Sequence, residues 1–174
     1  MAGETELGEE SLVGLYERLE RPLFNVAYRF VWSAADAQDI VQETFLRLWR
    51  MRSRVRIDSV EPLVYRIAIN LATSALRRRR LWRWVSLDPL WDRAASDPGA
   101  EELAMNQQQH ARMRSAIESL PLDLRKVVVL CELAGLSYAQ VAEALGIPPG
   151  TVGSRRHRAI ERLQQELSGA RNDQ

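Results

Sequence analysis

The sequence predicts an all-α protein built as two small helical domains joined by a flexible acidic linker. Long segments of the 174-residue chain have apolar residues at helical spacing, and none shows the strict alternation of a half-buried strand. Glycine and proline are sparse inside these segments. Residues 85–103 contain two Asp-Pro pairs, a glycine and no helical period, so they predict the linker between the domains.

Four helices are expected before this linker. The first covers about residues 11–20, and the second begins at Pro22, which suits the first turn of a helix. The third covers about 34–50, with an apolar face that includes Ile40, Phe45 and Leu48. The fourth covers about 62–83. A short basic loop, MRSRVRIDSVE, connects the third helix to the fourth.

After the linker we expect helices at about 102–119, 122–133, 138–145 and 149–167. Ser137 and Gln140 have the spacing of a capping box, which marks the start of the short third helix of this group. Gly146 ends that helix, and Pro149 stands near the first turn of the next one. Two helices separated by such a tight corner predict a helix-turn-helix.

The last helix has one polar, basic face. Thr151, Arg155, Arg158 and Arg162 share this face, with Ser154 beside them, while Val152, Ala159 and Leu163 lie on the opposite side. Arginine pairs well with guanine in a major groove, and serine or threonine can bind bases or phosphates. The alternative is an ordinary solvated basic face. The capped helix and the Gly-Ile-Pro-Pro-Gly corner before it favour DNA recognition.

Composition excludes several other functions. One cysteine, Cys131, allows no internal disulfide and no cysteine-based zinc site, and it stands in an apolar run typical of a core. His110 and His157 have no spacing typical of metal ligands. Nothing resembles a signal peptide, a membrane span or a catalytic nucleophile with its base. We therefore expect a soluble cytoplasmic protein, with no enzymatic activity and no cofactor.

The net charge of +1 hides a strong segregation of charge. Residues 51–84 hold nine arginines against two acids, while residues 85–103 hold five acids against one arginine. Four arginines follow one another at positions 77–80, where they surround the helix and cannot all bind one ligand. Neutralisation of phosphates explains this block better than ion pairing within the chain. The acidic linker could also mask the block, although a solvated tether is the commoner case.

Several motifs together resemble a known family. LPLDLRKVVVLCELAGLSYAQVAEALGIPPGTVGSRRHRAIERL is similar to region 4 of bacterial sigma factors. DAQDIVQETFLRLWR and PLVYRIAINLATSALRRRR are similar to two consecutive helices of sigma region 2. Only these two regions are present, as in the extracytoplasmic-function (ECF) group. The resemblance divides the chain into a region 2 domain (1–84), a linker (85–103) and a region 4 domain (104–174).

The resemblance implies a promoter-specificity subunit of RNA polymerase. Its expected partners are core RNA polymerase, through the β′ clamp and the β flap, promoter DNA and an anti-sigma factor. It places Asp39, Gln42 and Glu43 against the β′ clamp, and the recognition-helix residues Thr151, Ser154, Arg155, Arg158 and Arg162 on the −35 element. Contacts that bind and open the −10 element are expected from Arg54, Arg56, Tyr65, Arg66, Asn70, Arg77, Arg78 and Arg80.

The chain departs from the family at a few positions. Gly153 replaces a frequent lysine and should weaken its helix, and Arg156 replaces an apolar residue on the inner stripe. Leu63 and Ser74 replace a typical tryptophan and a frequent aspartate. Two alternatives stay open: an autonomous helix-turn-helix regulator, which leaves the first eighty residues unexplained, and a sigma-like decoy that binds an anti-sigma factor.

Overall fold

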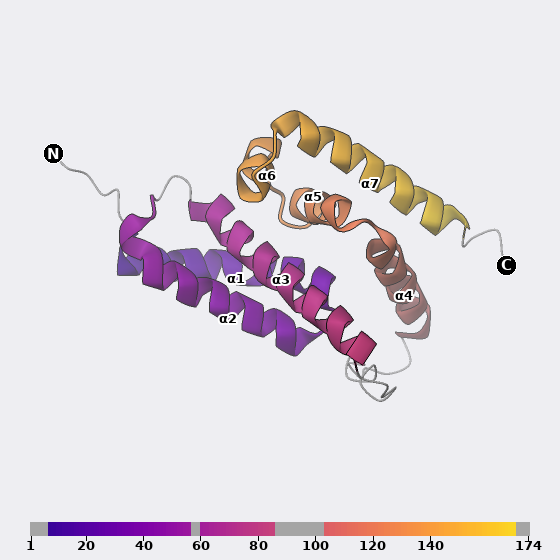
Figure 1. Cartoon of the computed structure of the whole chain (residues 1–174), viewed down its shortest axis with the longest axis horizontal. Helices are drawn as coiled ribbons and strands as arrows, with labels where there is room; N and C mark the ends of the chain where they lie inside the picture. The colour runs from indigo at the N-terminus through magenta and orange to yellow at the C-terminus, as the bar shows by residue number, and fades with distance from the viewer. Residues whose placement is uncertain (1–6, 57–59, 86–102, 170–174) are drawn as a thin grey trace.

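The computed structural model describes residues 7–56, 60–85 and 103–169, and these form α-helices with one short 3-10 helix. The first domain contains α1 (Glu9–Val31), α2 (Ala34–Met51), η1 (Arg52–Arg54) and α3 (Val60–Val85). The second contains α4 (Leu103–Ser119), α5 (Leu122–Glu132), α6 (Tyr138–Leu145) and α7 (Pro149–Gly169). Figure 1 shows the two groups of helices side by side. The all-α prediction is confirmed.

The prediction of two helices before residue 32 is wrong, because α1 runs through Pro22 without a break. A proline inside a helix removes one backbone hydrogen bond and crowds the carbonyl four residues earlier. Burial offsets this cost: Leu19, Leu23 and Val26, on both sides of the proline, are almost fully buried. Tertiary packing therefore overrides the local signal of Pro22.

The first domain is a bundle in which α1, α2 and α3 each pack against the other two. Ser33 caps the start of α2, since its side-chain oxygen accepts a hydrogen bond from the Asp36 N–H at 3.3 Å. Phe30, Val41 and Leu48 are fully buried between the helices. The predicted apolar face of α2 is therefore the face that the bundle buries.

The second domain places α7 across α5 and α6, with α4 beside the far part of α7 (Figure 1). Val127, Val141, Val152 and Ala159 are buried where these helices meet. The predicted bounds of the four helices agree with the structure to within two residues.

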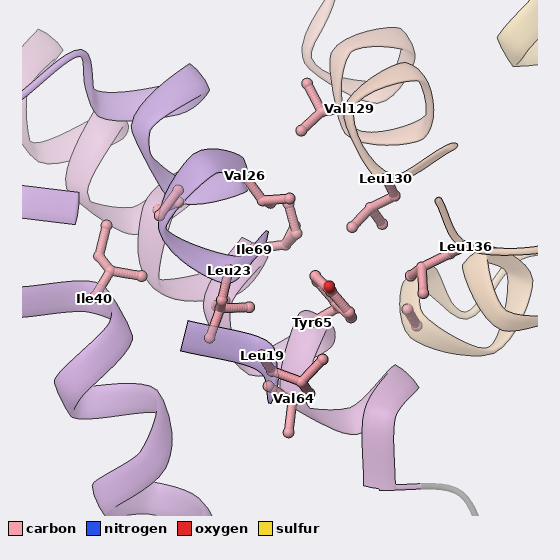
Figure 2. Packing of buried hydrophobic residues seen from close by; sticks show 14 of the residues in the cluster. Leu19, Leu23, Val26, Ile40, Val64, Tyr65, Ile69, Val129, Leu130 and Leu136 are labelled. Carbon is pink, nitrogen blue, oxygen red and sulfur yellow. The ribbon is translucent and has the colours of Figure 1, made fainter. Parts of the chain in front are cut away.

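The two domains also pack against each other, which the sequence does not predict. Helix α3 contacts α6, and α1 contacts both α4 and α5. One apolar cluster extends through both domains. Figure 2 shows Val129, Leu130 and Leu136 of the second domain facing Val26, Ile69 and Tyr65 of the first. The predicted linker falls almost wholly on 86–102, outside the described residues, so its proposed masking of the arginine block stays a prediction.

None of the described helices combines the length and the apolar character that crossing a bilayer requires.

Candidate nucleic-acid and polymerase interfaces

The corner between α6 and α7 is built by local hydrogen bonds. The Ser137 side chain accepts from the Gln140 N–H at 3.3 Å, and the Gln140 side chain accepts from the Ser137 N–H at 2.9 Å. This reciprocal pair confirms the predicted capping box. Gly146 ends α6 with φ of 65°, a left-handed conformation that suits glycine. Pro149 is the first residue of α7, where a missing N–H costs nothing.

The predicted recognition helix α7 turns its basic face outward. Ser154, Arg158 and Arg162 are exposed and Thr151 is half-buried, whereas Val152 and Ala159 are buried against the rest of the domain. The Ser154 hydroxyl donates to the Thr151 carbonyl at 3.1 Å. Figure 1 shows α7 at the outer edge of the second domain, with α5 between it and α3.

Arg155 differs from the other arginines of α7 because it is paired within the domain. Its Nη2 lies 3.1 Å from a carboxylate oxygen of Asp123 on α5, and its side chain is only 25% exposed. The pair holds one end of the guanidinium in place and leaves fewer donors for DNA. Asp123 was not among the predicted site residues, since nothing in its sequence context indicates that α5 and α7 meet there.

Arg156 of α7 also forms an ion pair within the second domain. Its Nε donates to the Glu132 carboxylate at 2.6 Å, although the sequence places Arg156 on the inner stripe. The carboxylate raises the pKa of this guanidinium, so the charge is kept. Gly153 precedes Arg156 by three residues in α7. A side-chain carbon added at Gly153 would stand 3.5 Å from the ring of Tyr138, which is an ordinary contact distance. The glycine is therefore not required by crowding within the domain.

On α3 the predicted −10 residues differ in their accessibility. Tyr65 is 1% exposed and packs at the boundary of the two domains (Figure 2). Burial, with a smaller contribution from Glu61, raises the pKa of its hydroxyl to about 12. The expectation that this ring meets an unstacked base does not hold for this conformation, because the second domain covers it. Asn70, about one turn further along α3, is exposed.

Arg66 reaches across to the second domain. Its Nε donates to the backbone carbonyl of Ala144 at 3.1 Å, and its Nη2 donates to the carbonyl of Glu143. Both carbonyls belong to the last turn of α6. In this conformation Arg66 serves domain packing rather than DNA.

The arginine block at the end of α3 divides into two groups. Arg77, Arg78 and Arg80 are exposed, as phosphate contacts require. Arg79 instead donates to the Val31 carbonyl and lies 3.9 Å from the Asp36 carboxylate. The sequence favours phosphate neutralisation over ion pairing for the whole block, but Arg79 takes part in an ion pair within the chain because the bundle brings α2 beside it.

The loop before α3 is only partly described. Arg54 ends η1 and is exposed, and Arg56 is exposed as well. The Arg52 guanidinium lies over the Trp49 ring at 3.9 Å, which anchors the start of the loop. The rest of the loop, residues 57–59, lies outside the described residues.

The predicted polymerase-binding face of α2 has a mixed character. Asp39 and Gln42 are exposed, whereas Glu43 accepts from Arg47 at 2.7 Å, which lowers the pKa of its carboxyl group. Leu46 stands on the same face, seven residues after Asp39, and is 43% exposed. Sequence reasoning missed Leu46, although an apolar residue on the polar face of α2 was a visible signal. Interfaces commonly combine such an apolar centre with a polar rim.

Cys131 lies half-buried in the second domain. Burial raises the pKa of its thiol, with a smaller effect from Glu132. A raised pKa disfavours the thiolate, so this cysteine has the properties of a packing residue.

These features define a class of protein: an all-α chain in which a helix-turn-helix with a basic outer face is joined to a three-helix domain with an arginine-rich helix. Comparisons with known families agree with this class. Residues 15–81 match the family described as Sigma-70 region 2, and residues 110–163 match Sigma-70, region 4.

Two relatives show the group within the family. The chain is 34% identical over 166 residues to the ECF RNA polymerase sigma factor SigE of Mycolicibacterium smegmatis, covering 92% of this chain but 65% of that protein. It is 35% identical over 159 residues to the RNA polymerase sigma-H factor of Pseudomonas aeruginosa, covering 86% of this chain and 82% of the relative. The chain belongs to the sigma-70 family and is similar to its ECF members.

A solved structure supports the same fold. The sigma factor RpoE of Bartonella quintana, determined with the anti-sigma factor NepR, superposes with a TM-score of 0.64 at 23% identity. The match covers 89% of this chain and 97% of RpoE.

Proposed function

We propose that this chain is a sigma factor that binds core RNA polymerase and directs promoter-specific initiation of transcription. The observation that carries the proposal is the presence of both sigma regions in one chain, each with an exposed surface of suitable chemistry. Region 4 presents the basic face of α7, and region 2 presents the face of α2 with its acidic and apolar side chains.

In this proposal α7 recognises the −35 element. Arg158, Arg162 and Ser154 are exposed for contact with bases or phosphates, and Thr151 stands at the start of the same face. Arg155 contributes through one side of its guanidinium while Asp123 holds the other. Phosphate contacts position a protein on DNA, whereas contacts to base edges give specificity.

Region 2 binds and helps to open the −10 element. Arg77, Arg78 and Arg80 supply exposed positive charge along α3, and Arg54 and Arg56 supply it at the preceding loop. Asn70 offers an exposed amide for a base, whereas Tyr65 and Arg66 join this surface only when the second domain moves away.

Core polymerase binds the face of α2 that holds Asp39, Gln42, Glu43 and Leu46, through the β′ clamp, and region 4 binds the β flap. Acidic and amide groups around an apolar side chain suit a partner surface rich in arginine. An anti-sigma factor is a further expected partner, since RpoE was determined with NepR. The chain itself carries out no catalysis in this proposal, and it acts in the cytoplasm, where bacterial promoters and polymerase are found.

An autonomous helix-turn-helix regulator is the weaker alternative, because it gives no role to the region 2 match over residues 15–81. A sigma-like decoy would need no exposed arginines on α7.

The test uses purified chain and core polymerase. We expect the two to co-elute in size-exclusion chromatography and to transcribe genomic fragments from start sites that share two upstream motifs. A chain that binds DNA but neither binds core polymerase nor directs initiation would contradict the proposal.

A further inference from the structure

Leu81 is the most exposed large apolar side chain in the part of the chain that the structure describes, with 66% of its surface accessible. It belongs to the last turns of α3. Exposed apolar residues that stand singly on a surface are common. Leu81, however, directly follows the arginine block of residues 77–80. Its neighbours, rather than its exposure alone, therefore indicate what it contacts.

The spacing along α3 places Leu81 next to two of these arginines. Residues three and four apart are neighbours on a helix surface, so Leu81 lies next to Arg78 and Arg77, which are both exposed. Arg80, the preceding residue, is exposed as well. The long stems of arginines can lie along an apolar side chain while their guanidinium groups reach outward. Leu81 is thus an apolar centre among these three positive charges.

The bundle lies on the opposite side of this part of α3. Arg79 donates to the Val31 carbonyl and lies 3.9 Å from the Asp36 carboxylate, at the corner between α1 and α2. Because Leu81 follows Arg79 by two residues, its side chain leaves the helix about 200° further around the axis. The side of α3 that carries Leu81 is therefore open to a partner.

Leu81 shares this open side with Asn70, the residue proposed above to contact a base. About three turns of helix separate the two, so both project in nearly the same direction. Ser74 and Arg77, which are also exposed, lie in the same row between them. From Asn70 to Leu81 the helix rises about 16 Å, or roughly five base-pair steps of B-DNA. DNA bound along this row can thus be open at Asn70 and duplex at Leu81.

A leucine among arginines suits the minor groove of a duplex. Proteins that enter this groove frequently insert an apolar side chain between two base pairs, which partly unstacks them and kinks the DNA. Burial of the leucine side chain offsets part of the cost of unstacking. The arginines around it can neutralise the neighbouring phosphates, which DNA supplies whatever its sequence. A protein partner would need acidic groups at matching positions.

We infer that Leu81 is a wedge that enters the minor groove of the duplex beside the −10 element and kinks the DNA there. The cost of a kink depends on the base-pair step that is deformed, and pyrimidine–purine steps such as TA and CA are easily kinked. Leu81 therefore gives the chain a preference for promoters with such a step beside the −10 element. The inference rests on the proposed function, since that function places region 2 on promoter DNA.

The test measures how DNA binding depends on one base-pair step. Core polymerase carrying this chain binds a series of promoter fragments, obtained from the transcription test above. In this series a single TA step is moved one position at a time through the duplex beside the −10 element. Dyes on the two DNA ends report the bend by energy transfer. The parent is compared with Leu81→Ala, with Leu81→Phe, which keeps an apolar wedge, and with Val13→Ala, a control at an exposed apolar residue of α1.

We expect the parent, Leu81→Phe and Val13→Ala to bind roughly tenfold more tightly when the TA step stands at one particular position, and to bend the DNA most there. Leu81→Ala should bind all the fragments with similar affinity and bend them less. Its thermal stability should match that of the parent, because most of the Leu81 side chain is already exposed. An equal step preference in the parent and in Leu81→Ala would overturn the wedge.

Two further comparisons separate the wedge from other roles. Arg78→Ala should weaken binding to every fragment, with a shallower salt dependence, and keep the step preference, as expected for a phosphate contact. If Leu81→Ala lowers the affinity for core polymerase in the absence of DNA, Leu81 contacts protein and the wedge is wrong.

Failure of the parent to bind core polymerase contradicts the proposed function. The free parent and Leu81→Ala are then compared at low salt on G·C duplexes with and without a single TA step. A preference for the TA duplex that Leu81→Ala loses supports the wedge, and equal binding by the two chains contradicts it.

Discussion

Arg155 and Arg158 both belong to the basic face of α7, yet among the described residues only Arg155 is held by a carboxylate, that of Asp123 at 3.1 Å. Arg158 is exposed, and its Nε donates to the backbone carbonyl of Ser154 at 3.4 Å. The two arginines therefore differ in how much of each guanidinium is available to DNA.

Arg158→Ala should weaken binding to the −35 element without changing the stability of the chain. Losing a base contact costs roughly 1–3 kcal/mol for the cognate sequence, whereas losing a phosphate contact weakens all sequences alike. Fluorescence anisotropy with cognate and scrambled duplexes over a salt series distinguishes the two roles. Unchanged binding to both duplexes would show that this face of α7 does not meet DNA.

Asp123→Asn should strengthen DNA binding, because it frees the guanidinium of Arg155. Without the carboxylate the guanidinium gains freedom and the surface loses a negative charge, so binding to scrambled DNA should strengthen, most clearly at low salt. Asn keeps the size of the side chain, and Glu118→Gln on α4, whose carboxylate pairs with Arg114, is the control. Equal affinity of parent and Asp123→Asn for scrambled DNA would mean that the ion pair has no influence on DNA binding.

Leu46→Glu and Asp39→Arg should each weaken binding to core polymerase and leave the helix content unchanged, because both side chains point outward from α2. Leu46→Glu places a charge in the proposed apolar centre, and Asp39→Arg introduces repulsion against a basic partner. Glu43 is a poorer choice for substitution because its pairing with Arg47 would also be lost. Glu17→Arg, exposed on α1, is the control in the same pull-down.

Gly153→Ala should stabilise the second domain by up to about 1 kcal/mol, the difference in helix propensity between the two residues. The added carbon would meet the Tyr138 ring at 3.5 Å, which requires no movement. Thermal unfolding followed by circular dichroism measures the effect as a rise of about 2–4 °C in Tm. If Tm falls, the packing of α7 on α6 is tighter than this distance indicates.

Tyr65 should make the folded chain sensitive to alkaline pH. Below pH 10 its hydroxyl is protonated in both the folded and the unfolded chain. As pH rises from 10 toward 12 the unfolded chain ionises first, so the folded state loses stability. Urea unfolding between pH 10 and pH 12 should show that the free energy of unfolding falls less steeply with pH for Tyr65→Phe than for the parent.

The sequence by itself determined the helices of the second domain and the corner between α6 and α7. These depend on interactions between residues close together in the sequence, such as the Ser137–Gln140 capping box and the left-handed Gly146 at the end of α6. The basic face of α7 was also visible, because residues spaced along one helix share a side whatever surrounds it. Pro22 misled the prediction of α1, since the burial of Leu19 and Leu23 outweighs a local signal.

Tertiary structure alone decided how the charged groups are used. Arg79 turns to Asp36, Arg155 to Asp123 and Arg66 to the end of α6, over sequence separations of 43, 32 and 77–78 residues. No period or motif links residues so far apart, because their meeting depends on how whole helices pack. The burial of Tyr65 likewise depends on the second domain, which packs against the first through a shared apolar cluster and the hydrogen bonds of Arg66.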